Sequence, residues 1–316
     1  MGQAVGAYAC PVFIGWLILA QTVRWSEPVM SAVTWLAFAV LVTRWAARRA
    51  WPGAIRAIVA SPLSPMAVAA AVSALVNGGW SRAADWTLYA VMLACFLDAR
   101  PDLDRHLLRV GKLVITVCLV EWAYLAMRGQ WNERIHLLGN PNVIAAMICL
   151  LVPLLDWPWR VLSAVVVVAT GSRAGMVGLG LWGAAYAGRW WGWAACALVS
   201  LLMVAARPAG SLLRLAFWHE AVRLFSTHPF IGVGPGLYRY GNWVHAHNLG
   251  LTWLAETGLI GLLALLVTIL RYGRRSDRLD LSPIIAVIPF FIFDDMTMYW
   301  AVSLGALYLV SRKGKA

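Results

Sequence analysis

Long stretches of apolar residues recur from the beginning of the chain to its end. Many approach the ~20 residues that a helix needs to cross the hydrocarbon layer of a membrane. Apolar and polar residues do not alternate inside them, so the pattern favours helices over the strands of a barrel. We interpret it as about twelve spans, with ten or eleven also compatible, in a single integral membrane domain of residues 1–316. The expected spans begin near Ala4, Val29, Ala57, Ala84, Leu113, Asn142, Val161, Gly175, Trp190, Leu249, Ser282 and Met296.

Composition supports an all-α, polytopic transmembrane bundle. The chain is 61% hydrophobic and 13% charged, with a mean hydropathy of +0.72, whereas soluble domains carry roughly 25% charged residues. The first apolar run, 4–23, lacks a basic leader and a clear cleavage site, so we interpret it as a retained span. The cysteines all lie in apolar runs without a C-x-x-C pair, which predicts small buried side chains rather than disulfides or a zinc site. They are Cys10, Cys95, Cys118, Cys149 and Cys196.

The net charge of +12 reflects basic residues that flank the spans rather than a nucleic-acid surface. With both termini in the cytoplasm, most basic residues and every lysine fall in cytoplasmic loops such as Arg44–Arg56 and Asp98–Lys112, as the positive-inside rule expects. The basic residues left on the outer side are all arginines, which bind phosphate better than lysines do. They are Arg24, Arg82, Arg128, Arg134, Arg173, Arg207, Arg214, Arg223 and Arg239.

Residues 207–248 are the longest stretch without an apolar run, and we expect them to form an outer loop between spans nine and ten. The loop begins with an amphipathic helix, 211–225, that would lie in the interface and cap the bundle. Its apolar stripe consists of Leu213, Phe217, Ala221 and Leu224. The glycines of His228–Gly236 indicate a tight turn, since no strand precedes them as a dinucleotide site would require. A backbone nest for an anion is the alternative.

The sequence His245-Ala246-His247-Asn248 opens the tenth expected span. Asn248 can cap the helix. The helix N-terminus and nearby arginines disfavour imidazolium at His247, which leaves a neutral ring able to accept a proton. On an uninterrupted helix, Gly258 and Gly261 would lie on one stripe beneath His247 and let a neighbouring helix approach closely. The alternative for a single histidine at an interface is a polar anchor.

Arg173 lies in Thr170–Gly175, between two apolar runs with almost no loop. An arginine at that depth costs several kcal/mol unless it meets an anion or lines a wet cavity. This position therefore favours an anion-binding role.

Four motifs, in order along the chain, resemble the O-antigen ligase superfamily, which also contains O-antigen polymerases and protein O-oligosaccharyltransferases. The last of them, His247-Asn248 followed by Gly258 and Gly261, matches the H-N-x9-G-x-x-G signature of the ligases. The others are Gly139-Asn140-Pro141-Asn142, Ser172-Arg173-Ala174-Gly175 and the segment His228–Gly236.

The resemblance implies a lipid-phosphosugar glycosyltransferase of GT-C type that works at the periplasmic face of the bacterial inner membrane, without a metal or other cofactor. Its donor would be a glycan on undecaprenyl pyrophosphate, and its acceptor a sugar hydroxyl of lipid A–core. His247 would be the base that removes the acceptor proton, supported by Asn248, Gly258 and Gly261, with His245 as a second candidate for the base. Arg173, helped by Arg214 or Arg128, would bind the pyrophosphate, and in-line displacement would invert the anomeric carbon.

Other interpretations remain open at the level of sequence. A polymerase or a protein O-oligosaccharyltransferase shares the donor chemistry. A transporter of lipid-linked sugars is typically built with paired broken helices and internal symmetry, and the sequence indicates neither. A non-catalytic scaffold would leave the arginine and histidine cluster unexplained. Asp102-Leu103-Asp104 resembles a metal-binding D-x-D, but the charge pattern places it in a cytoplasmic loop. Asp294-Asp295 is expected to pair with outer arginines, with contact to the acceptor as the alternative.

Overall fold

The computed structural model describes residues 45–49, 51–98, 100–130, 133–135, 140–187, 208–243, 245–275 and 288–290, with a few isolated residues beside these ranges. Every regular element within these ranges is a helix, so the all-helical fold predicted from the apolar runs is confirmed. Several predicted features lie outside the described residues, namely Gly139, Asp294-Asp295 and the spans expected to begin near Ala4, Trp190 and Met296. Most of the spans expected to begin near Val29 and Ser282 lie outside them as well.

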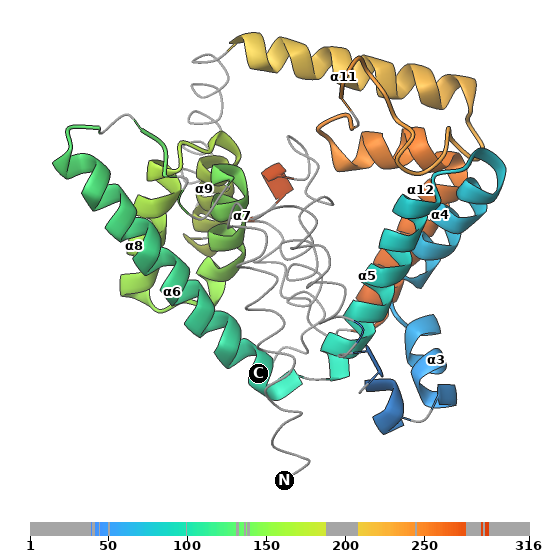
Figure 1. Ribbon diagram of the computed structural model, residues 1–316, viewed down its shortest axis with the longest axis horizontal. Helices are drawn as coiled ribbons and strands as arrows, with labels where there is room; N and C mark the ends of the chain where they lie inside the picture. Colours follow the sequence, from blue (N-terminus) through green and yellow to red (C-terminus); the bar gives the residue numbers. More distant parts are fainter. Residues whose placement is uncertain are drawn as a thin grey trace.

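The first group of helices, here called the α4–α12 group, lies on the right of Figure 1. Its members are α3 (Trp51–Val59), α4 (Ser64–Asn77), α5 (Trp80–Asp98) and α12 (Leu249–Arg275). Helices α3 and α4 meet at 85°, because Pro62 interrupts the chain between them and Pro65 is accommodated in the first turn of α4. Arg271 of α12 ties this corner together, since its Nη1 donates to Ser64 Oγ at 2.6 Å and to the Val59 carbonyl at 3.2 Å.

The second group, here called the α6–α9 group, lies on the left of Figure 1. Its members are α6 (Arg100–Met127), α7 (Pro141–Leu151), the 3-10 turn η1 (Val152–Leu154), α8 (Trp157–Ala169) and α9 (Arg173–Ala187). Asn140 starts α7, because its side-chain oxygen accepts the N–H of Asn142 at 2.9 Å and Pro141 occupies the first helical position. The Asn-Pro-Asn motif is therefore the start of a helix.

The segment Asp98–Lys112, expected to be a loop between spans, is mostly helical. Helix α6 begins at Arg100 and runs to Met127. Leucine, arginine and lysine, which make up nearly half of the segment, are good helix formers, and Pro101 stands in the first turn, where its missing N–H removes no helical hydrogen bond. The apolar part of α6, Leu107–Met127, is the part long enough to cross a membrane.

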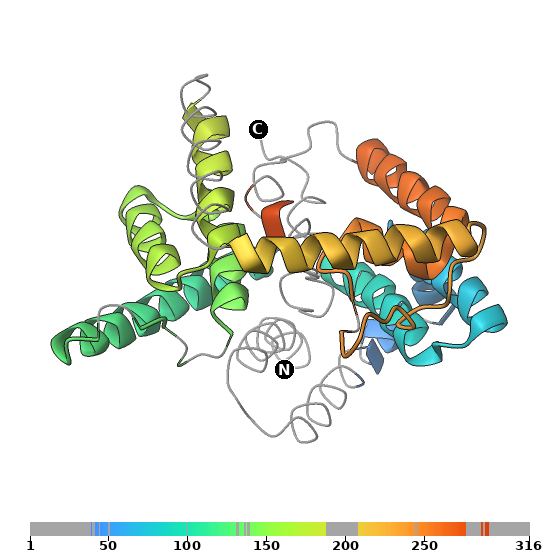
Figure 2. The same ribbon diagram turned by 90° about the horizontal axis from the view of Figure 1, so that it is seen from above.

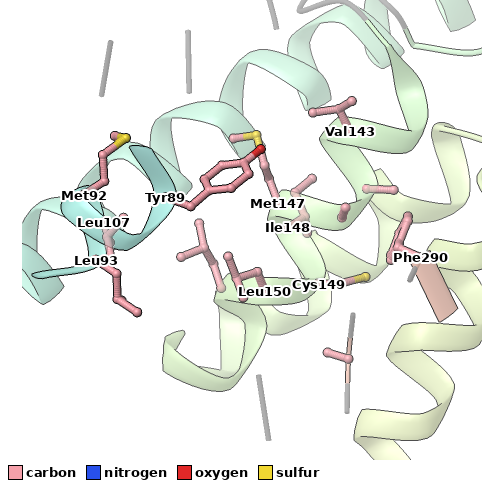
Figure 3. Close-up of a cluster of buried hydrophobic side chains, with 14 of the residues drawn as sticks. Tyr89, Met92, Leu93, Leu107, Val143, Met147, Ile148, Cys149, Leu150 and Phe290 are labelled. Atoms are coloured by element: carbon pink, nitrogen blue, oxygen red, sulfur yellow. The ribbon is translucent and has the colours of Figure 1, made fainter. Parts of the chain in front are cut away.

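A buried apolar cluster joins the two groups. Figure 3 shows Tyr89, Met92 and Leu93 of α5 in this cluster together with Met147 and Ile148 of α7. Every residue of α7 from 143 to 151 is buried. A helix that is apolar all round and buried all round is a core element, so α7 is the centre of the α6–α9 group, where it packs against α6, α8 and α9.

Helix α11 (Pro208–Thr227) lies across one end of the molecule, and reaches from the side of the α6–α9 group to that of the α4–α12 group (Figures 1 and 2). Phe217 and Ala221, one turn apart, are both 1% exposed, which confirms the centre of the predicted apolar stripe. Leu224 is partly buried against the apolar cluster that contains Phe217 and Ala221, whereas Leu213 is exposed.

Two described helices, Leu107–Met127 of α6 and Leu249–Arg271 of α12, are long and apolar enough to cross a membrane. The bent pair of α3 and α4 passes the same test when it is taken as one unit, and Pro141–Leu154 and Trp157–Ala169 are shorter apolar helices. The number of twelve spans, the single membrane domain of 1–316 and the position of 207–248 as an outer loop stay predictions.

Candidate active site

His247 lies two residues before α12 and has a left-handed backbone, with φ of +50°. Among the described residues it is the one non-glycine with a positive φ. This conformation costs an L residue roughly 1–2 kcal/mol, and such positions concentrate at functional sites. The neighbouring His245 supports it, because Nδ1 of His245 accepts the N–H of His247 at 3.4 Å. Asn248 starts the helix as predicted, with its Oδ1 accepting the N–H of Leu251 at 2.9 Å.

Three rings surround the half-buried imidazole of His247. Phe217 of α11 stacks on it, with ring centroids 5.3 Å apart and 24° between the planes. Trp243 meets it edge-on at 5.1 Å, and His245 meets it edge-on at 4.2 Å. These contacts fix the plane and the position of the imidazole.

Phe217, the ring beneath His247, is itself held by Tyr238. The buried hydroxyl of Tyr238 donates to the carbonyl of Phe217 at 2.9 Å. Burial, and then the negative charge of Glu220, raise the pKa of Tyr238 well above its usual range, so the hydroxyl remains a donor. Arg223 donates from Nε and Nη2 to Glu220 at 2.7 and 2.6 Å, and this contact lowers the pKa of Glu220.

Helix α12 is broken at Gly258, where φ is +62° and ψ is −152°. The sequence-based geometry assumed a continuous helix that placed Gly258 and Gly261 on one stripe beneath His247. That geometry is wrong, because the helix begins only at Leu249 and changes course at Gly258.

The motif segment His228–Gly236 fills this break. The N–H groups of Leu259 and Ile260 donate to the carbonyls of Pro229 and Phe230 at 2.8 and 3.1 Å, and the N–H groups of Val233 and Gly234 donate to the carbonyls of Ala255 and Glu256, each at 3.0 Å. A Cβ on Gly258 would lie 2.6 Å from the carbonyl carbon of Phe230, and one on Gly232 would collide with the backbone of Glu256. The two motifs therefore form a single hydrogen-bonded unit that requires glycine on both sides.

Helix α4 holds the same unit from the other side. Ser73 Oγ donates to the carbonyls of Ile231 and Glu256 at 2.7 and 2.9 Å, and Asn77 Nδ2 donates to the carbonyl of Gly232 at 3.1 Å. The direction in which α12 leaves His247 is thus set by α4 as well as by the motif segment.

Gly261 makes room for a tryptophan. Nε1 of Trp253 donates to the carbonyl of Gly261 at 2.9 Å, and the Trp253 ring meets that of Trp86 on α5 at 4.5 Å. A Cβ on Gly261 would collide with Thr257 and lie 2.9 Å from Nε1 of Trp253. The role of Gly261 is to pack α12 rather than to contact His247.

Arg173 is the first residue of α9. Ser172 caps this helix, since its Oγ accepts the N–H of Gly175 at 3.3 Å, and Gly175 packs closely against Ala145 of α7. The Ser-Arg-Ala-Gly motif therefore places a guanidinium at a helix N-terminus, where the partial positive charge of the helix also attracts an anion.

A second guanidinium, that of Arg134, lies at the same α8–α9 turn. Its Nε donates to the carbonyl of Thr170 at 2.6 Å, and a Cβ on Gly171 would lie 3.1 Å from that nitrogen. Arg134 had no motif to single it out among the outer arginines. Its place depends on Thr170, which lies 36 residues further along the chain.

The other two candidate arginines lie in different surroundings. Arg214 stands one turn before Phe217 on α11, so it is carried close to the ring that stacks on His247. Arg128 follows the end of α6, where Nη1 donates to the hydroxyl of Tyr124 at 3.0 Å. Both views place that end of α6 at the opposite edge of the molecule from α12 (Figures 1 and 2). The structure therefore brings Arg214, but not Arg128, toward His247, and Arg173 belongs to the α6–α9 group.

The apolar helices, and the polar histidine and arginine positions at helix ends, define a multi-pass membrane protein with an all-helical fold. Residues 160–266 match the family model of the O-antigen ligase, which confirms the family resemblance over a stretch that holds Arg173, Arg214, His247, Gly258 and Gly261. The match indicates a glycosyltransferase-type enzyme at the level of the family. No curated protein matches the chain.

Proposed function

We propose that this protein is an O-antigen ligase-like glycosyltransferase that moves a glycan from undecaprenyl pyrophosphate to a hydroxyl of lipid A–core at the periplasmic face of the inner membrane. The observation that carries the proposal is that the family match contains His247, whose ring is held by three other rings on a left-handed backbone. If His247 were only a polar anchor at the membrane interface, neither the ring contacts nor the left-handed backbone would be needed.

In the proposed reaction, an imidazole nitrogen of His247 takes the proton of the acceptor hydroxyl as its oxygen forms a bond to the anomeric carbon of the donor. The bond from that carbon to the pyrophosphate oxygen breaks on the opposite side, and the pyrophosphate leaves with the electron pair. The anomeric carbon is inverted. A positioned base contributes about 10²–10⁴ in rate, and no nucleophilic side chain is needed because pyrophosphate is already a good leaving group.

His247 rather than His245 is the better candidate for the base. Nδ1 of His245 is engaged with the N–H of His247, so His245 acts as a positioning residue. The ring of His247 is the one that Phe217 and Trp243 orient.

Arg173 and Arg214 are proposed to bind the departing pyrophosphate, because guanidinium groups stabilise the growing negative charge without a metal. The two residues belong to different elements, α9 and α11. The diphosphate would therefore lie between the α8–α9 turn and the neighbourhood of Phe217. Arg128 has no part in this arrangement, because it follows the far end of α6.

The break in α12 and the bent pair of α3 and α4 are features that a transporter would also show, and the sequence did not indicate them. In transporters, the unwound backbone of such a break binds the cargo or a coupling ion. Here the groups freed near Gly258 are already bonded to residues 229–234. The break thus serves to join the motif segment to α12, and transfer chemistry remains the better explanation.

Complementation of a ligase-deficient bacterium tests the proposal. We expect wild-type protein to restore long-chain lipopolysaccharide on a gel, and His247→Ala and Arg173→Ala to fail at equal membrane abundance. Arg128→Ala serves as the control and should complement. Full restoration by an abundant His247→Ala protein would exclude His247 as the base. Glycosylation of a pilin in place of lipopolysaccharide by the wild type would assign the acceptor to protein.

A further inference from the structure

Two aromatic side chains, Tyr240 and Trp243, contact the buried ring of Phe217 and are themselves well exposed. Trp243 is 44% exposed and Tyr240 is 39% exposed, whereas Phe217 beneath them is 1% exposed. The Tyr240 and Trp243 rings lie 5.5 and 5.3 Å from the Phe217 ring. Each therefore rests on Phe217 while much of its surface remains open.

A tight hairpin turn joins the two residues that carry these rings. Tyr240 and Trp243 exchange both backbone hydrogen bonds, each at 3.0 Å, across Gly241 and Asn242. Gly241 has φ of +57°, which such a two-residue turn requires. Directly paired residues of a hairpin project on the same face, so the turn presents two rings together, with the exposed Asn242 beside them.

The rings have the chemistry of a surface for a sugar. A pyranose has an apolar face of C–H groups, which an aromatic face attracts through its partial negative charge and its apolar area. The hydroxyls of the same sugar lie around the edge of its ring, and Asn242 offers an amide to them. Because the Trp243 ring meets that of His247 at 5.1 Å, a sugar stacked on Trp243 would carry its hydroxyls beside the imidazole.

We infer that Trp243 and Tyr240 form the platform that binds a sugar ring of the acceptor and presents one of its hydroxyls to His247. This inference rests on the proposed function and deepens it, because it makes the acceptor a saccharide. A serine or threonine of a protein acceptor has no ring to stack. The other occupant of such a surface is lipid, since Trp and Tyr also anchor proteins at the membrane interface.

Binding and kinetics on the purified full-length protein distinguish these cases. The binding probe is core oligosaccharide released from lipid A, measured by calorimetry, and the kinetic acceptor is rough lipopolysaccharide with a saturating lipid-linked glycan donor. We expect Trp243→Ala to weaken oligosaccharide binding and to raise the acceptor KM by roughly 3- to 10-fold, with the donor KM unchanged. Trp243→Phe and Tyr240→Phe keep a ring and should stay close to wild type, and Tyr240→Ala should follow Trp243→Ala.

Trp157→Ala is the matched control, because Trp157 is 71% exposed at the start of α8, in the other helix group. It should change neither the oligosaccharide affinity nor the acceptor KM.

Unchanged oligosaccharide binding in folded Trp243→Ala would overturn the inference, as would wild-type protein that binds no oligosaccharide. A fall in kcat with both KM values unchanged would instead assign Trp243 to positioning His247. A loss of membrane insertion alone would assign it to lipid. An inactive wild type that still binds the oligosaccharide through Trp243 would reject the proposed transfer and retain the platform.

Discussion

At the scale of single residues, His247 combines a reactive side chain with an unfavourable backbone. Its φ of +50° is tolerated because Phe217, Trp243 and His245 contact the ring and Asn248 begins the helix immediately after it. The ring contacts and the backbone strain act in opposite directions on stability. The two effects can be separated by comparing His247→Gly with His247→Ala, because both variants remove the ring and only glycine adopts a positive φ without a steric penalty.

We expect His247→Gly to be more stable than His247→Ala by roughly 1–2 kcal/mol, because glycine adopts positive φ without the steric penalty of a Cβ. Thermal unfolding in detergent measures the difference. At Ser226, an exposed helical position of α11, the order should reverse, since glycine destabilises a helix relative to alanine. Equal stability of the two His247 variants would contradict a strained backbone at this position.

Tyr238→Phe should lower the free energy of unfolding by about 1–2 kcal/mol, because it removes the hydrogen bond to the buried carbonyl of Phe217. The raised pKa of Tyr238 adds a pH dependence. Its contribution to stability is complete below the ordinary tyrosine pKa of about 10, and is lost as pH rises above that value toward the folded-state pKa. Denaturant titrations from pH 8 upward should show this loss in wild type and less of it in Tyr238→Phe. Tyr186→Phe, at a tyrosine 69% exposed on α9, is the control variant and should retain the loss of stability that wild type shows.

At the scale of elements, the break in α12 and the segment His228–Gly236 depend on each other. The segment supplies backbone hydrogen-bond partners to α12 on both sides of Gly258. Ser73 of α4 links the two, because its hydroxyl donates to a carbonyl of the segment and to a carbonyl of α12. The motif glycines are therefore explained by backbone geometry and not by contact with a substrate. Their effect on the site is indirect, through the direction in which α12 leaves His247.

Gly258→Ala should be strongly destabilising, because its φ and ψ belong to a region that is nearly exclusive to glycine, at a cost of about 1–3 kcal/mol, and because the new Cβ would press on the carbonyl carbon of Phe230. Gly250→Ala is the matched control on the same helix, where a Cβ meets nothing closer than 3.5 Å. It should be neutral or stabilising by up to about 1 kcal/mol. Chemical denaturation of the two variants measures the contrast, and equal midpoints would rule out the tight contact at the break.

The sequence predicted these elements unevenly, for physical reasons. The stripe of α11 was predictable, because the burial of Phe217 and Ala221 follows from helical periodicity within four residues. The break in α12 was not, since the apolar pattern continues through Gly258 and the partners of the freed groups lie in 229–234, far outside any helical window. Arg134 was missed for the same reason, because its contact with Thr170 is non-local.

At the scale of the whole molecule, the proposed site draws on both helix groups. Arg173 starts α9 in the α6–α9 group, and α12 follows His247 in the α4–α12 group. Helix α11, which carries Arg214, reaches across from one to the other (Figures 1 and 2). A diphosphate held by Arg173 and Arg214 would therefore connect the two groups, and its binding would stabilise their arrangement.

Undecaprenyl pyrophosphate should accordingly raise the unfolding temperature of the wild-type protein, because a ligand that binds only the folded state stabilises it by mass action. Charged hydrogen bonds contribute roughly 1.5–3 kcal/mol each, so Arg173→Ala and Arg214→Ala should each weaken binding by about 10- to 100-fold. The double variant should lose less than the sum of the two free energies, since groups that share one partner are coupled. Arg128→Ala should retain the full thermal shift, because Arg128 follows the far end of α6. If Arg128→Ala instead weakens binding as much as Arg173→Ala does, the diphosphate lies over the α6–α9 group alone, and α11 does not take part in holding it.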